Sequence, residues 1–283
     1  MKLEKSATPI ERIWHYCFML ICAIVFFFLI APIIVIIPLA FNAEPYFTFT
    51  EKMLAFNPEG YSLRWYKDLL GSDEWMSSIR NSFFIATVSA FVATTLGTIA
   101  ALGLHRKQMP YKATIMAVLI SPMIVPLIIS AAALFSFYSR IDLANTFTGV
   151  ILSHVVLGTP FVVITVTASL SGFDERLIQA AQSLGANQKE TFFRVILPLL
   201  LPGVISGALF AFITSLDEVV LVLFLAGPEQ TPMTVRMFSG LREEISPTIL
   251  ALASILVLIS ICLLTTLELI RRRNERMRGM SAG

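Results

Sequence analysis

The sequence predicts an all-α integral membrane protein with six membrane-spanning helices. Of its 283 residues, 56% are hydrophobic and only 14% are charged, whereas about a quarter of the residues of a soluble domain carry a charge. Six apolar stretches are long enough to cross a hydrocarbon core of about 30 Å as helices that rise about 1.5 Å per residue. The net charge of +2 is small and gives no reason to expect a nucleic-acid partner.

The expected spans form a single transmembrane domain over residues 1–283. They lie at about 14–41, 79–104, 114–138, 148–170, 199–225 and 248–270. The first span exceeds the apolar core of a cleavable signal peptide, about 7–15 residues, and is therefore expected to remain in the protein. Three prolines within spans three and four are expected to kink their helices: Pro122, Pro126 and Pro160.

Small residues at four-residue spacing occupy one face of the fifth span, namely Gly203, Gly207 and Ala211. Such a face lets two helix backbones approach closely, so we expect it to pack against a neighbouring helix. His154 and the cysteines Cys17, Cys22 and Cys262 lie inside apolar runs. They show no metal-ligand spacing and are expected to be buried packing residues, with neither a disulfide nor a metal site.

The distribution of basic residues predicts which side of the membrane each loop faces. Six spans place both termini on one side. That side, with residues 105–113 and the loop 171–198, holds 14 of the 21 Lys and Arg residues. The positive-inside rule therefore predicts that both termini and the loop 171–198 are cytoplasmic.

The loop 171–198 is the one long polar stretch between apolar segments in the C-terminal half. Its first part has apolar residues at helical spacing: Leu177, Ala180, Ala181 and Leu184. This spacing predicts a short helix with one apolar face, and Gly185 follows where a C-terminal cap belongs. The stripe is made mostly of small residues, so the groove of another protein could approach its backbone. The alternative is an amphipathic helix that lies on the membrane surface.

These residues also match a family pattern. Gln179-Ala180-Ala181, three residues, Gly185, nine residues and then Val195-Ile196-Leu197-Pro198 resemble the EAA loop of bacterial ABC-importer permeases. Gln179 replaces the usual Glu, and Val195 departs mildly. The resemblance implies the type I importer permease fold and a loop that docks on an ATPase subunit. The implied docking residues are Leu177, Gln179, Ala180, Ala181, Leu184, Gly185, Leu197 and Pro198.

Two acidic residues, Asp217 and Glu218, lie within the apolar run of the fifth span. A charge at the centre of a bilayer costs at least about 2.5–3.5 kcal/mol, so such residues are candidates for function. In a continuous helix Asp217 shares a face with Phe210, Thr214, Leu221 and Phe224, while Glu218 is turned away by about 100°. A carboxylate beside aromatic rings suits an organic cation. The expected substrate-pathway residues are Asp217, Glu218, Phe210, Thr214 and Phe224. Alternatively, the acids pair with a partner helix or lie in water at the outer end of the span.

The same region resembles the spermidine/putrescine branch of the permease family. The resemblance rests on Thr214-Ser-Leu-Asp-Glu-Val-Val220, on Ala226-Gly-Pro228 and on Thr159-Pro-Phe-Val-Val163. It implies that the substrate is a small organic cation, a polyamine such as spermidine or putrescine. Glu218 stands where a second Asp is common in that branch. Another small solute, such as an amino-acid-like compound or a different organic cation, remains the alternative.

The resemblance also implies partners. Importers of this kind combine two permease subunits, here expected to be different chains, with an ATPase dimer and an extracellular or periplasmic substrate-binding protein in the bacterial inner membrane. The chain has no GxxxxGK[ST] sequence, so ATP and Mg²⁺ are expected on the ATPase subunits and no cofactor in this chain. No catalytic residue is expected, because the histidines are scattered and the acids isolated. A secondary transporter is the remaining alternative, although the two halves show no inverted repeat.

Overall fold

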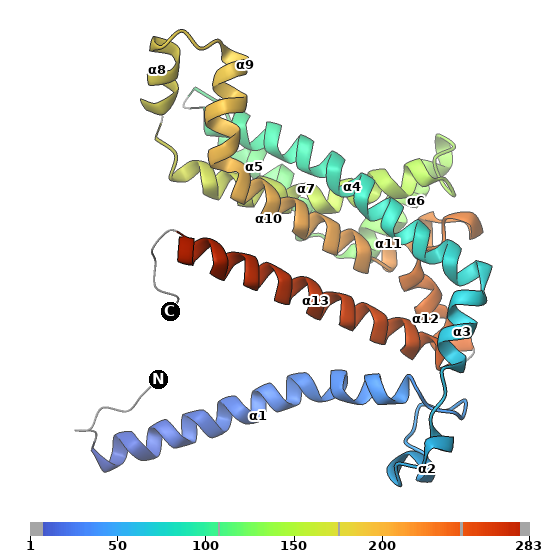
Figure 1. The fold of residues 1–283 in the computed structure, drawn as a ribbon. Helices are drawn as coiled ribbons and strands as arrows, with labels where there is room; N and C mark the ends of the chain where they lie inside the picture. The colour runs from blue at the N-terminus through green and yellow to red at the C-terminus, as the bar shows by residue number, and fades with distance from the viewer. Residues whose placement is uncertain (1–7, 107, 175, 244–245, 278–283) are drawn as a thin grey trace. The chain divides into compact units, whose positions relative to one another are not determined.

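The computed structural model describes residues 8–106, 108–174, 176–243 and 246–277, and this part of the chain is almost entirely helical (Figure 1). Within it, extended backbone pairing is limited to one isolated bridge, between Asn42 and Tyr61. The predicted all-α class is therefore confirmed. The chain termini, which were predicted to be cytoplasmic, lie outside the described residues at 1–7 and 278–283.

The helices follow one another with short connections. The α-helices are α1 (Pro9–Leu39), α2 (Glu51–Leu54), α3 (Arg64–Gly71), α4 (Asp73–His105), α5 (Lys112–Ile120), α6 (Leu127–Arg140), α7 (Phe147–Ser171), α8 (Arg176–Ser183), α9 (Gln188–Thr191), α10 (Leu197–Asp217), α11 (Val220–Leu225), α12 (Met233–Glu243) and α13 (Thr248–Met277). Shorter turns are η1 (Pro58–Gly60), η2 (Ser121–Met123), η3 (Phe192–Ile196) and η4 (Pro228–Gln230). Of these turns, η3 is a π-helix and the others are 3₁₀-helices.

Four helices among the described residues are long and apolar enough to cross a membrane. They are α1, α4, α7 and the continuous helical stretch Gln188–Asp217. A fifth candidate is the pair Lys112–Met123 and Leu127–Arg140, and the shorter apolar segment Thr248–Cys262 begins α13. The six predicted stretches thus all fall on helices, although six complete spans are not resolved by length and composition alone.

The third predicted span is bent much more sharply than the kink expected from its prolines. Its two helical parts, Lys112–Met123 and Leu127–Arg140, meet at an angle of 96°. Pro122 lies in the 3₁₀ turn η2 and Pro126 caps α6. Proline removes a backbone donor and clashes with the preceding turn, so two prolines four residues apart end one helix and start another. In contrast, α7 continues through Pro160.

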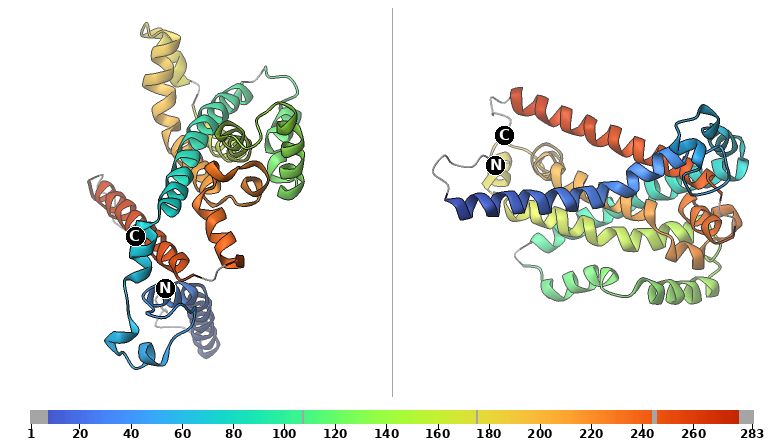
Figure 2. Two further views of the ribbon diagram at one scale, coloured as in Figure 1. Left: turned by 90° about the vertical axis from the view of Figure 1, so that its right-hand side faces the viewer. Right: turned by 90° about the horizontal axis from the view of Figure 1, so that it is seen from below.

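The chain divides into two units, and the candidate site lies wholly in unit 2, residues 73–239. Here α4, α7 and α10 pack against one another to form the core (Figure 2). The small-residue face of α10 lies against α7, as predicted: a Cβ on Gly207 would be 2.8 Å from the Cα of Val162. The buried His154 of α7 shares a 2.7 Å hydrogen bond through Nδ1 with the hydroxyl of Ser215 on α10, which agrees with a packing role.

Unit 1 consists of residues 1–72 and 240–283. Its α13 packs against α1 and α3, and the hydroxyls of Tyr66 and Ser254 lie 2.7 Å apart. Most of α1 is exposed in the isolated chain. The expectation of buried cysteines is wrong: Cys17 of α1 and Cys262 of α13 are exposed, and Cys22 of α1 is half-buried.

Candidate functional site

The predicted helix of the 171–198 loop forms as α8. Asp174 starts the helix, since its carboxylate oxygen accepts a hydrogen bond from the backbone N–H of Arg176 at 2.9 Å. Its backbone carbonyl accepts another from Leu177 at 3.1 Å. These bonds satisfy donors that the first turn of any helix leaves without partners. The helix is only two turns long, so it depends on its caps.

Gly185 ends α8, as predicted from its spacing. Its φ angle of 89° lies in the left-handed region, which glycine adopts without a steric penalty. The backbone N–H of Gly185 donates to the carbonyl of Gln182 at 2.9 Å, and that of Ala186 donates to the carbonyl of Ala181 at 3.0 Å. This pair of bonds is the Schellman motif, which closes a helix and turns the chain sharply.

The apolar stripe of α8 is largely exposed in the isolated chain. Leu177 is 44% exposed and Leu184 is 89% exposed. Ala180 is also exposed, whereas Ala181 is half-buried. The face is therefore apolar, and the described residues leave most of it uncovered, with Ala181 as its least exposed member. An exposed apolar face of this kind is a candidate for contact with another molecule.

The second half of the loop runs directly into the fifth span. Asn187 and Glu190 form a capping box, with bonds of 2.9 and 3.0 Å between side chains and backbone, which starts α9. The π turn η3 follows and ends directly before Leu197 and Pro198. A wider π turn relieves the clash between a proline ring and the preceding carbonyl. The helical stretch Gln188–Asp217 is thereby continuous, so Leu197 and Pro198 are part of the span and not of the helix α8.

The fifth span ends eight residues earlier than the predicted 199–225, because the helix stops at Asp217. The backbone of Glu218 is extended, with φ −72° and ψ 124°. Its carboxylate accepts a hydrogen bond from the N–H of Leu221 at 2.8 Å, and Glu218 is only 8% exposed. A buried carboxylate that bonds to the first turn of a new helix lowers the energy of starting α11.

Because α10 ends at Asp217, the single helix face that was expected to carry Asp217, Phe210, Thr214, Leu221 and Phe224 does not form. Asp217 lies on one face of α10 with Phe210 and Thr214, but Phe224 belongs to α11 and Leu221 is buried there. Asp217 is exposed, Thr214 is half-buried and Phe210 is 51% exposed. The ring of Phe210 stacks on that of Phe161 of α7, with centroids 6.0 Å apart. The structure therefore places an acid and a hydroxyl along one face of α10, with a pair of stacked aromatic rings about two turns from Asp217.

Polar side chains of α4 hold the segment that follows α11, and sequence reasoning missed them. The amide of Asn81 donates to the carbonyl of Glu229 at 2.8 Å. The hydroxyl of Ser82 accepts a hydrogen bond from the N–H of Met233 at 2.8 Å. In the sequence, the available signal for these contacts was the pair of polar residues at the start of an apolar span. Both residues are buried, and buried polar groups require hydrogen-bond partners.

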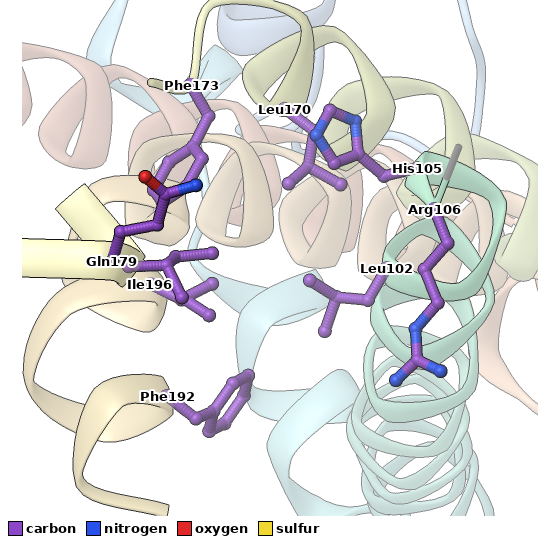
Figure 3. A pocket seen from close by; sticks show the side chains of 9 residues that line it. Leu102, His105, Arg106, Leu170, Phe173, Gln179, Phe192 and Ile196 are labelled. Carbon is purple, nitrogen blue, oxygen red and sulfur yellow. The ribbon is translucent and has the colours of Figure 1, made fainter. Parts of the chain in front are cut away.

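A pocket of about 420 Å³ lies beside α8, and the sequence did not predict it (Figure 3). It is lined by Leu102, His105, Arg106, Leu170, Phe173, Ile178, Gln179, Phe192 and Ile196. Of the predicted docking residues, Gln179 thus lines this pocket. The pocket joins the end of α4 to residues 170–196, two parts of the chain that are distant in sequence, which explains why no local pattern indicated it.

The fold and the loop define the class of this protein. Residues 93–276 match the family described as "Binding-protein-dependent transport system inner membrane component", and the chain belongs to this family. It is the multi-pass membrane permease component of an ABC importer, and the predicted type I permease fold is confirmed. A chain of the solved bacterial ABC transporter for alginate import has the same fold, with a TM-score of 0.72 at 14% identity over 94% of this chain and 99% of that chain.

Comparison with similar sequences shows which members of this family the chain resembles. The chain is 32% identical over 252 residues to the "Spermidine/putrescine transport system permease protein PotC" of Haemophilus influenzae, covering 89% of this chain and 95% of that protein. It is also 32% identical over 239 residues to the "Putrescine transport system permease protein PotI" of Escherichia coli K12, covering 82% of each. A second alginate transporter structure, in complex with a periplasmic protein, has a TM-score of 0.64 at 17% identity over 99% of this chain and 100% of that chain.

Proposed function

We propose that this chain is one of two permease subunits in an ATP-driven importer of a polyamine such as spermidine or putrescine. The names of the relatives support the substrate class, and the chain covers most of their length. The single observation that carries the mechanism is the exposed apolar face of α8, joined by one tight turn to a helix that runs continuously to Asp217.

The face of α8 is the proposed contact with the ATPase. Leu177 and Leu184 flank a surface of alanines, which a cleft of the partner could cover closely. ATP and Mg²⁺ would bind to the ATPase dimer, and its closure would move α8. Gln179 cannot supply the negative charge of the usual Glu, so this contact would rely on apolar burial, at roughly 25 cal/mol per Å² of surface removed from water.

The helix Gln188–Asp217 is the proposed mechanical link. Only residues 184–187 separate it from α8, and the Schellman bonds close this turn. A displacement of α8 would therefore be transmitted along about 30 residues of helix to the acid at its far end. Packing of α10 on α4 and α7 would spread the movement to the core of unit 2.

Asp217 is the proposed contact for a substrate ammonium group. It is exposed, and Phe210 and Thr214 lie on the same helix face. A carboxylate attracts the cation, while aromatic rings accommodate the methylene chain and add cation–π attraction. Phe224 of α11 would contribute a further aromatic ring to the substrate contact. Glu218 would act by positioning, since its carboxylate holds the start of α11 next to Asp217.

The remaining partners follow from the family. A second permease, a different chain, would complete the pathway, and a substrate-binding protein would deliver the solute from outside. In the inner membrane, the excess of basic residues would place the termini and α8 on the cytoplasmic side. The ATPase would bind there.

Uptake into proteoliposomes that contain the full complex tests the proposal. We expect ATP-dependent uptake of labelled spermidine or putrescine, and loss of most uptake in Asp217→Asn with the ATPase still bound. Asp142→Asn is a matched control, because Asp142 is also exposed and its φ of 56° suits asparagine. Equal uptake by Asp217→Asn and parent would remove Asp217 from the pathway. Uptake that persists without ATP under a held ion gradient would instead indicate a secondary transporter.

A further inference from the structure

We propose that the pocket beside α8 binds an anionic phospholipid, with the phosphate at Arg106 and an acyl chain on the apolar wall. The leaflet rests on the orientation proposed above and would be the cytoplasmic one. The chemistry of the pocket does not depend on that orientation. Its volume of about 420 Å³ falls within the range of roughly 300–1,000 Å³ that is usual for ligand sites.

Most of the pocket wall is hydrocarbon. Leu102 of α4 and Leu170 of α7 lie on one side, and Phe192 and Ile196 of η3 lie across from them (Figure 3). Ile178 of α8 also lines the pocket. Phe192 and Ile196 are one turn apart and so lie on one face of their helix. Water gains few hydrogen bonds in a space lined in this way, whereas an acyl chain would bury its surface favourably.

The polar groups of the pocket are donors of the kind that bind a phosphate. Leu102 and His105 lie three residues apart on one side of α4, and Arg106 follows directly after the end of this helix. Figure 3 shows Gln179 on the opposite side of the pocket, with its amide available as a further donor. A guanidinium group matches a phosphate with two parallel hydrogen bonds. Among the described residues, those that line the pocket include no acidic side chain that would repel an anion.

The position favours a lipid over a soluble anion. Leu102 and Leu170 belong to the last turns of α4 and α7, two of the helices long enough to span the membrane. Arg106 is exposed just beyond the end of α4. Basic pockets at the ends of spanning helices are where anionic head groups bind, because the acyl chains remain in hydrocarbon while the phosphate reaches the charged rim.

A lipid at this site would connect three moving parts. It would contact the end of α4, the start of α10 through η3 and the inner side of α8 through Ile178 and Gln179. The exposed stripe of α8 would stay open for the ATPase, because Leu177 and Leu184 do not line the pocket. The bound lipid would therefore set the angle at which α8 is presented.

Native mass spectrometry of the full complex, purified from membranes and exchanged into mixtures of phosphatidylglycerol and phosphatidylcholine, tests the proposal. We expect phosphatidylglycerol to be retained and Arg106→Gln to weaken its binding about tenfold, the effect of losing a charge-assisted contact. Arg194→Gln is the matched control, since Arg194 is an exposed arginine of η3 that does not line the pocket. Leu102→Phe, which fills the apolar side, is a second variant and should also reduce retention.

Three results would overturn the proposal. Equal retention by Arg106→Gln and Arg194→Gln would mean that the lipid binds elsewhere. Displacement of phosphatidylglycerol by millimolar inorganic phosphate or glycerol phosphate would indicate a simple anion site. Loss of the ATPase from Arg106→Gln with unchanged lipid would assign Arg106 to an acidic group of the ATPase. Lipid retention is measured without transport, so its failure is distinct from failure of the importer assignment.

Discussion

A single backbone angle at Gly185 determines how α8 ends. With φ at 89°, the chain reverses within three residues and enters α9 without a long loop. An L-residue in the left-handed region costs roughly 1–2 kcal/mol. The helix α8 contributes little stability of its own, because a helix of two turns is only marginally stable in water without its caps. A backbone penalty of this size at Gly185 should therefore destabilise α8 strongly.

Replacement of Gly185 by valine should disrupt the C-terminal cap of α8 and reduce co-purification of the ATPase severalfold, while membrane insertion remains intact. The measurement is the ratio of ATPase to permease after affinity purification. Gly172→Val is the control, because a Cβ there meets nothing within 4 Å and φ is −96°. An unchanged ratio for Gly185→Val would count against α8 as the docking helix.

At the scale of elements, the packing of α10 on α7 holds the core of unit 2 together. The contact is close because glycines remove side chains from the interface. A Cβ on Gly207 would lie 2.5 Å from the hydroxyl of Thr165 and 2.8 Å from the Cα of Val162. The second atom belongs to the backbone and cannot rotate away. Helix association in membranes depends on such close approach.

Gly207→Leu should force α7 and α10 apart and destabilise the protein by about 1–3 kcal/mol, the usual effect of overpacking. The check is the thermal unfolding midpoint of the purified permease in detergent, which should fall. Gly103→Leu introduces the same side chain near the end of α4, where nothing lies within 4 Å of the added Cβ. A similar midpoint for both variants would show that the α7–α10 contact is not critical.

At the scale of the whole molecule, the distribution of basic residues predicts the orientation in the membrane. In the predicted topology, the connection between α4 and α5 lies on the side that holds 14 of the 21 Lys and Arg residues. The residues between α1 and α2 are predicted to lie on the opposite side. The two regions therefore provide accessible markers for the two faces of the membrane.

We expect Gln108→Cys to react with a membrane-impermeant maleimide only after the cells are opened, and Glu44→Cys to react in intact spheroplasts. Both residues are exposed. The background would carry serine in place of Cys17, Cys22 and Cys262. The reverse labelling pattern would invert the topology and place α8 on the outer side.

Much of the fold could be read from local patterns. All six predicted apolar stretches fall on helices, because a membrane leaves the backbone of an apolar segment no other way to satisfy its hydrogen bonds. The helix α8 and its glycine cap were also predictable, since both depend on residues within one or two turns.

Tertiary structure decided where helices end inside apolar runs and which distant residues meet. The sequence from 199 to 225 is largely apolar on both sides of Asp217 and Glu218, yet α10 stops at Asp217, where Glu218 bonds to the first turn of α11 and the core buries Leu221. The pocket beside α8 joins Leu102, Leu170 and Ile196 from three separate helical segments. Local periodicity carries no information on such contacts, since their free energy arises only when the helices pack together.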